Sequence, residues 1–157
     1  MRDSGVALTV LPATDLFLMG HGSTHSVPRG VAPAHRLLQQ GVTCSISTNN
    51  VLNPFTPFGD GSLLRMANMY ANVLQVGGSA AMELCFEMVT SQSPKLMNVE
   101  DYGVRVGNVA DLVVVDASTP SAAVAQIAQP LFGLKAGRET FNRPLPAVFR
   151  PLAAAAE

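Results

Sequence analysis

The chain has few charged residues. Asp, Glu, Lys and Arg make up 13% of its 157 residues, against roughly 25% in ordinary globular domains. The formal net charge is -1, and no run of basic residues occurs. Nucleic acid and anionic membranes are therefore not expected as partners, because both attract proteins through clustered positive charge. The shortage of charge agrees with a surface that another element covers.

Cysteine and long apolar runs are also scarce. Cys44 and Cys85 are the two cysteines and neither belongs to a CxxC pair, so reduced thiols in a cytoplasmic protein are expected rather than a disulfide framework. The apolar run from Gly5 to Ala13 is much too short to span a bilayer, and Arg2 and Asp3 do not begin a signal peptide. With 48% hydrophobic residues, the chain can form one substantial core.

The pattern along the first part of the chain predicts an α/β fold. Val6 to Leu11 and Val42 to Ser47 are apolar, β-branched runs that predict strands, and Val31 to Gln40 predicts a helix that ends at Gly41. A strand, helix, strand order predicts a crossover unit whose strands are adjacent and parallel. Pro12 to Gly30 is predicted to be a long irregular loop, and such loops usually border a binding site.

The second part of the chain is expected to contain three more helices and a hairpin. Helices are expected over Ser62 to Val76, with Asp60 as its N-terminal cap, over Ser79 to Thr90 and over Ser121 to Ala128. From Asn98 glycine turns lead into an apolar strand, and Leu131 to Leu134 and Glu139 to Phe141 are expected to form a hairpin. We therefore expect domain boundaries at 1–97, 98–143 and 144–157, the last a tail.

A polar loop follows the second predicted strand. The segment Gly41 to Gly59 begins as a strand and then presents Asn49, Asn50 and Asn53 among prolines and aromatic residues. In α/β barrels and open α/β sheets, reacting groups are displayed at the carboxyl ends of strands. Function is therefore expected at this loop.

Two segments resemble the amidohydrolase superfamily. Tyr102 to Asp116 has the pattern G-x-x-x-G-x-x-A-D-L-V-V-x-D, which resembles the stretch where the catalytic (β/α)8 barrel of that superfamily returns to a small β-sandwich. Gly41 to Gly59 resembles the eighth barrel strand and its loop in the cytosine deaminase branch, which includes triazine-ring amidohydrolases. The resemblance covers about Met1 to Phe141. It implies the C-terminal part of a (β/α)8 TIM barrel, with its last two strands and helices, and part of the composite β-sandwich.

The resemblance also implies a chemistry. Members hydrolyse non-peptide carbon–nitrogen bonds, here by deamination or ring amide hydrolysis of a cytosine-like or triazine-like heterocycle. A divalent metal, zinc or iron, supplies hydroxide because it lowers the pKa of bound water. Its ligands are an HxH pair on the first strand, a later histidine and an aspartate that ends strand eight. Only the last position falls in this chain, so we expect this segment to bind no metal and to be inactive without the missing N-terminal barrel portion.

The strand-eight motif assigns positions to individual residues. It puts Asn49 at the catalytic and metal-binding aspartate and Asn50 at a second acidic position that contacts substrate. An asparagine is a poor metal ligand and cannot act as a general base, because its amide carries no negative charge. Asn49 and Asn50 are therefore expected to orient substrate or water. Asn53, Asp15 and His21 are further candidates for substrate contact, although Asp15 also fits a loop-capping role.

Histidine spacing gives a weaker signal. His21 and His25 stand four apart, which on a helix would place a possible metal pair on one face. The sequence around them is a poor helix former, so a substrate-facing or simply polar loop role is favoured. His35, on the following predicted helix, is expected at the surface or in packing.

Two other interpretations stay open. The chain could be a non-catalytic pseudoenzyme or small-molecule binding protein that contacts a heterocycle through Asn49, Asn50 and Asn53. It could also be a truncated product without activity. An in-frame HxH strand and central histidine upstream would favour the hydrolase, and their absence would favour binding. A homo-oligomer is compatible with each interpretation.

Overall fold

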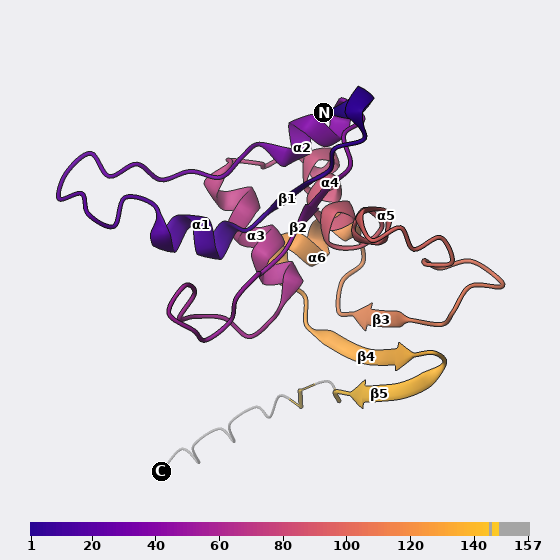
Figure 1. The fold of residues 1–157 in the computed structure, drawn as a ribbon. Helices are drawn as coiled ribbons and strands as arrows, with labels where there is room; N and C mark the ends of the chain where they lie inside the picture. The colour runs from indigo at the N-terminus through magenta and orange to yellow at the C-terminus, as the bar shows by residue number, and fades with distance from the viewer. Residues whose placement is uncertain (145, 148–157) are drawn as a thin grey trace, which may run out of the picture.

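The computed structural model describes residues 1–144 and 146–147 as a mixed α/β fold with two separate sheets (Figure 1). One sheet is a parallel pair of β1 (Leu8–Val10) and β2 (Cys44–Ile46), and the other is antiparallel with the order β3 (Leu112–Val115), β4 (Pro130–Lys135), β5 (Arg138–Asn142). The helices are η1 (Arg2–Ser4), α1 (Pro12–Leu18), α2 (Ala34–Gln39), α3 (Leu63–Val73), α4 (Ser79–Val89), α5 (Ser93–Leu96) and α6 (Pro120–Gln126). Within the described residues, no helix has the length and apolarity needed to cross a bilayer.

β1 and β2 run side by side in the same direction, which confirms the predicted crossover unit. The register matches Leu8 with Cys44 and Val10 with Ile46. Just beyond the pair, the Ser47 N–H donates to the Val10 carbonyl at 3.0 Å. The carboxyl ends of both strands therefore lie side by side, and the segments that follow them start close together.

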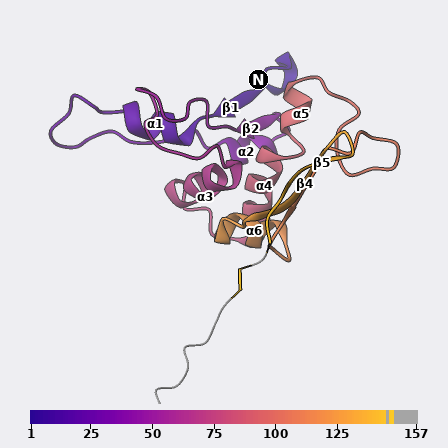
Figure 2. The same cartoon turned by 90° about the horizontal axis from the view of Figure 1, so that it is seen from below.

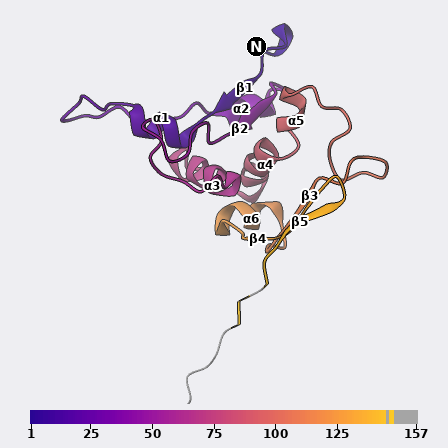
Figure 3. The same cartoon turned by 60° about the horizontal axis from the view of Figure 1, so that its bottom comes forward.

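The two faces of this parallel sheet differ in polarity. Val10, Cys44 and Ile46 are buried in the main core, which the helices complete. On the opposite face the hydroxyls of Thr9 and Ser45 form a hydrogen bond of 2.8 Å, as expected because successive strand residues point to opposite sides. The helices therefore cover the apolar face. α3 and α4 form a layer between the sheet and α6 (Figures 2 and 3).

The predicted irregular loop over Pro12 to Gly30 is wrong in its first part, where the chain forms α1. Pro12 occupies the first turn of this helix, where its missing N–H is not needed and its fixed φ suits the helix. Thr14 on α1 is buried, and Met19 ends the helix in an extended conformation. Only the remainder of the predicted loop is irregular, and it extends away from the body of the protein (Figure 1).

The N-terminal cap of α3 is Ser62 and not the predicted Asp60. The Ser62 hydroxyl accepts a hydrogen bond from the Arg65 N–H at 3.2 Å. Asp60 lies two residues before the capping position, and its carboxylate instead accepts from the Ser62 N–H at 3.0 Å and pairs with the Arg65 guanidinium at 2.7 Å. The sequence holds two good capping residues close together, and only the residue directly before the helix can serve.

The other predicted elements are present with shorter bounds. The ranges 31–40, 79–90 and 121–128 contain α2, α4 and most of α6, and the expected hairpin is β4 and β5. It turns at Ala136 and Gly137, which both have a positive φ, of 49° and 75°, as tight hairpin turns require. The expected tail from Pro144 lies mostly outside the described residues.

His35 and Tyr70 connect α2 to α3 inside the core, so the packing role expected for His35 is confirmed. The His35 N–H donates to Tyr70 Oη at 3.0 Å, and His35 Nδ1 lies 2.7 Å from the same oxygen. Burial raises the pKa of Tyr70 to about 12, so the phenol keeps its proton and donates it to Nδ1. Burial, with a smaller contribution from the Arg36 charge, lowers the pKa of His35 below 6.5. The native state therefore holds a neutral imidazole.

We predict that His35 makes folding sensitive to acid. Its folded pKa lies below the unfolded value of 6.5, so the unfolded chain takes up the proton first as the pH falls, and the free energy of unfolding decreases from that point down to the folded pKa. Urea unfolding at about pH 7.5 and about pH 5 should show a smaller pH dependence in His35→Gln than in the wild type. The exposed His25→Gln should leave the dependence unchanged. Equal pH dependence in all three proteins would contradict the prediction.

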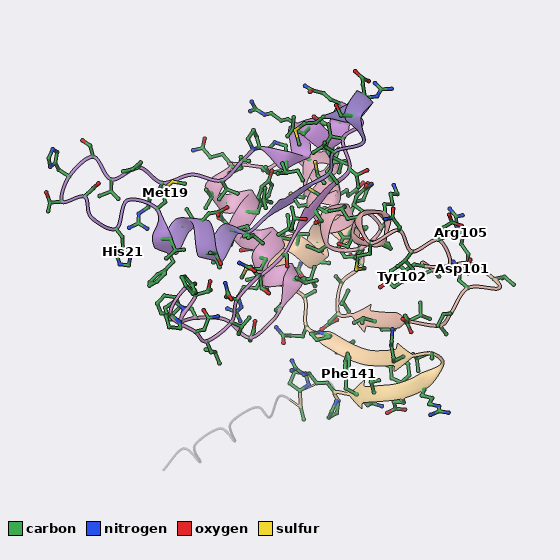
Figure 4. The ribbon with its side chains drawn as sticks, in the orientation of Figure 1. Met19, His21, Asp101, Tyr102, Arg105 and Phe141 are labelled. Carbon is green, nitrogen blue, oxygen red and sulfur yellow. The ribbon has the colours of Figure 1, made fainter. Side chains whose placement is uncertain are left out.

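Gly133 on β4 lies beneath the ring of Phe141 on β5, a residue labelled in Figure 4. A Cβ added at Gly133 would lie 2.2 Å from Phe141 Cε1, so an alanine requires the ring to move. We predict that Gly133→Ala lowers the free energy of unfolding by about 1–3 kcal/mol, as overpacking usually does. Gly22→Ala, where nothing lies within 4 Å, is the matched control. In calorimetry or urea unfolding, equal stability of the two variants would contradict the predicted clash between the added Cβ and the Phe141 ring.

Candidate functional site

The segments that follow β1 and β2 meet at the carboxyl-terminal end of the parallel sheet. β1 leads into α1, and β2 leads into the loop of residues 47–62, called here the asparagine loop. The hydroxyls of Thr14 on α1 and Thr56 in the asparagine loop form a hydrogen bond of 2.6 Å, and both residues are buried. Ligands of open and closed parallel α/β sheets bind at this carboxyl-terminal end of the strands.

Asn49 is exposed on the asparagine loop. Its backbone has a φ of 58°, a left-handed conformation that asparagine tolerates better than most residues. Its N–H donates to Ser47 Oγ at 3.4 Å. No hydrogen bond joins the Asn49 side-chain amide to any residue in 1–144 or 146–147, so both polar atoms of this amide can contact a ligand.

Asn53 is used within the loop. Its Oδ1 accepts from the N–H groups of Phe55, at 3.0 Å, and Thr56, at 3.1 Å. Its Nδ2 donates to Asn50 Oδ1 at 2.8 Å. The backbones of Asn53 and Thr56 also pair in both directions at 3.1 Å. The structure therefore brings Asn50 and Asn53 together and anchors both beside the buried Thr56.

Asp15 and His21 belong to the segment after β1. Asp15 is half-buried on α1, and its carboxylate forms no hydrogen bond or ion pair with a described residue. His21 is exposed just beyond α1 (Figure 4) and packs edge-on against Phe17, with ring centroids 5.3 Å apart. Phe17 in turn packs against Phe58 of the asparagine loop at 5.9 Å. His21 therefore joins an aromatic cluster, whereas His25 is exposed further along the loop.

Sequence reasoning missed the contacts that join the two segments. An open cavity of about 370 Å³ lies between α1, α3 and the asparagine loop, and Phe17 and Phe58 line it together with Arg29 and Arg65. The aromatic residues after β2 were visible in the sequence, but their partner Phe17 lay in a segment predicted to be irregular. The Thr14–Thr56 contact had no sequence signal, because two threonines so far apart have no expected relation.

The described residues do not fit a metal ion. Within residues 1–144 and 146–147, no three His, Cys, Asp or Glu side chains form a cluster. His35 is bound to Tyr70, and burial raises the pKa of the Cys85 thiol to about 11 and raises that of Cys44, which keeps both thiols protonated and therefore poor ligands. Asn49 offers a neutral amide where a carboxylate would bind a metal.

The sequence profile of the amidohydrolase family matches residues 1–141, and the chain belongs to this family. It is also 30% identical over 107 residues to N-isopropylammelide isopropyl amidohydrolase from Pseudomonas sp. (strain ADP). That match covers 68% of this chain and 27% of the relative. The predicted superfamily and its cytosine deaminase-like branch are confirmed.

Solved structures share the fold. 5-Methylcytosine deaminase from Klebsiella pneumoniae, liganded with 5-fluorocytosine, superposes with a TM-score of 0.87 at 24% identity, over 94% of this chain and 36% of that one. Atrazine chlorohydrolase from Arthrobacter aurescens TC1, complexed with zinc, superposes with a TM-score of 0.65 at 22% identity, over 94% and 34%. The chain thus spans about a quarter of the length of its curated relatives and about a third of these structures.

We predict that the Thr14–Thr56 hydrogen bond stabilises the contact between α1 and the asparagine loop. Thr14→Val and Thr56→Val should each lower the free energy of unfolding by about 1–3 kcal/mol, because each leaves a buried hydroxyl without its partner. The double variant should cost less than the sum of the two single changes. Thr43→Val, at a half-buried threonine outside this contact, should change stability little. Strict additivity in urea unfolding would show that the two hydroxyls do not interact.

Proposed function

We propose that these residues supply the last two β/α units of an amidohydrolase (β/α)8 barrel and part of its composite β-sandwich. The observation that carries this proposal is the parallel pair of β1 and β2, with helices on one face and the Thr9 and Ser45 hydroxyls on the other. In such a barrel the helices cover the outside, and the other face of each strand looks inward. The asparagine loop then lies at the end of the barrel where reacting groups are displayed.

The open edges of the parallel sheet support this arrangement. β1 and β2 each have a single neighbour among the described strands, so the outer edge of each carries unpaired backbone groups. Parallel sheets are normally buried and contain more strands, and two strands alone are marginally stable at best. In the proposed barrel, strands from polypeptide outside these 157 residues pair with both edges.

Residues 98–143 are proposed to belong to the sandwich, and 1–97 to the barrel. Several valines between α5 and β4 are largely exposed: Val104, Val106, Val113 and Val114. Apolar side chains grouped along one segment usually mark a surface that another element covers. In the proposed arrangement the rest of the composite sandwich covers them. Residues 144–157 remain a proposed tail.

We further propose that the complete protein hydrolyses a carbon–nitrogen bond of a small cytosine-like or triazine-like heterocycle. Asn49 stands at the family's catalytic position, and its amide can bind and orient ligand or water but cannot take up a proton. Asn50, Asn53, Asp15 and His21 are the proposed surroundings of the substrate. Zinc or iron used by the complete protein would need ligands beyond the residues that the structure describes, since these do not fit a metal.

A non-catalytic binding protein is the second candidate. The neutral Asn49 favours it, because its amide cannot take a proton from water and hydrolysis of such a ring needs an activated water. In that case the amides of Asn49 and Asn50 would hold a heterocycle without converting it. The same site would serve both functions, and turnover distinguishes them.

The isolated 157-residue chain should not release ammonia or an alkylamine from cytosine, 5-methylcytosine or N-isopropylammelide, with or without added zinc or iron. The complete protein, meaning these residues together with everything encoded upstream in the same reading frame, should release amine and contain metal by elemental analysis. The physical reason is that Asn49 cannot act as a base and that the described residues hold no cluster of side chains that fits a metal to activate water.

Each outcome separates the candidates. Metal-dependent turnover by the isolated chain would refute the proposed division between this segment and the rest of the barrel. A complete protein that binds these heterocycles in calorimetry but releases no amine would support the binding protein. Turnover by the complete protein that falls strongly in Asn49→Ala but not in the exposed Asn98→Ala would support the hydrolase with Asn49 in its site.

A further inference from the structure

The orientation of the Asn53 amide is fixed by its neighbours. The N–H groups of Phe55 and Thr56 both point at the same atom of this side chain. Two donors can share only an acceptor, so that atom is the oxygen, Oδ1. The NH2 group therefore lies on the other side of the amide, where it faces the side chain of Asn50 at 2.8 Å.

The orientation of Asn50 follows from that of Asn53. A donating NH2 group needs an acceptor opposite it, so Asn50 turns its Oδ1 toward Asn53 and its own NH2 group away. No group in residues 1–144 or 146–147 accepts a hydrogen bond from Asn50 Nδ2. Since no buried side-chain nitrogen or oxygen of the described residues lacks a partner, Asn50 Nδ2 reaches solvent. Asn50 thus presents donors to its surroundings.

The geometry points to Asn53 as a positioning residue that holds Asn50 as a hydrogen-bond donor at the carboxyl end of β2. We infer that position 50 selects a heterocycle that offers it an acceptor, a ring carbonyl oxygen or an unprotonated ring nitrogen. An acidic residue at position 50 would offer only acceptors and would select the opposite polarity, an amine or ring N–H. The ligand class rests on the proposed function, whereas the polarity of Asn50 rests on the hydrogen bonds alone.

The surrounding loop keeps this arrangement in place before any ligand arrives. Asn53 is paired through its backbone with Thr56. Thr56 is 2% exposed, and its hydroxyl is hydrogen-bonded to that of Thr14 on α1. A rotation of the Asn53 amide would direct its NH2 group at two backbone N–H groups, which is strongly unfavourable. A polar group that is oriented in advance discriminates between ligands better than one that can turn.

The variant Asn53→Asp tests the inference. Its carboxylate still accepts from the N–H groups of Phe55 and Thr56, so the turn is kept, but it cannot donate to Asn50. The Asn50 amide should therefore rotate, with its NH2 group toward the new carboxylate and its oxygen outward. Hydrogen exchange of the Asn50 side-chain NH2, followed by 15N NMR on the 157-residue chain, should slow by about tenfold, as expected for a charge-assisted hydrogen bond.

A control variant and a second substitution complete the NMR experiment. Asn98→Asp makes the same change of charge at an exposed asparagine outside the loop and should leave the exchange of Asn50 unchanged. Protection of the Asn50 NH2 in the wild type, or no slowing in Asn53→Asp, would overturn the inference. If Asn53→Asp does not fold, Asn50→Asp keeps Asn53 as a donor and should protect the Asn53 NH2 more strongly. Failure of that protection would likewise overturn it.

Ligand choice is tested on the complete protein with uracil and cytosine, which have opposite polarity at two neighbouring ring positions: an N–H and a carbonyl oxygen in uracil, an unprotonated nitrogen and an amine in cytosine. Asn53→Asp and Asn50→Asp should both shift the ratio of the two dissociation constants, and in the same direction, by about tenfold or more, because an unpaired polar contact is heavily penalised. An unchanged ratio would overturn the selectivity. If no form binds either ring, the proposed function fails, and the NMR experiment still decides the orientation of Asn50.

Discussion

The parallel pairing of β1 with β2 is the contact on which the rest of the structure depends. Ser47 donates to the Val10 carbonyl where the two strands end, so the segments that follow begin at the same place. The Thr14–Thr56 hydrogen bond and the packing of Phe17 on Phe58 continue this association beyond the sheet. A strand pair of three residues each thereby determines the position of every candidate site residue.

The pairing could be predicted because it follows from composition and order along the chain. β-branched runs on either side of a helix leave few topologies open, and a crossover through a helix places the two strands in parallel. The helix α1 could not be predicted in the same way. Pro12 suggests a break when it is considered alone, yet it is well suited to the first turn, and only the burial of Thr14 and neighbouring apolar residues makes a helix favourable there.

The candidate site was only partly readable from the sequence. The motif resemblance placed Asn49 and Asn50 on the loop after the strand, and the structure puts them there. The roles of side chains within the loop depend on hydrogen bonds that no spacing rule specifies. Asn53 resembles its neighbours in the sequence, but its oxygen completes a turn with Phe55 and Thr56 while its nitrogen faces Asn50. Likewise, Asp60 and Ser62 are equally good capping residues until the helix start is known.

Asn53 is followed directly by Pro54, and this order bears on the chemical lifetime of the loop. Asparagine deamidates to aspartate mainly when the backbone nitrogen of the next residue attacks the side-chain amide, expels ammonia and forms a succinimide ring. Proline has no backbone N–H and so cannot lose the proton that this attack requires. The amide that sets the direction of Asn50 is thus protected from deamidation through a succinimide, whereas Asn49 and Asn50, each followed by a residue with a free N–H, lack that protection.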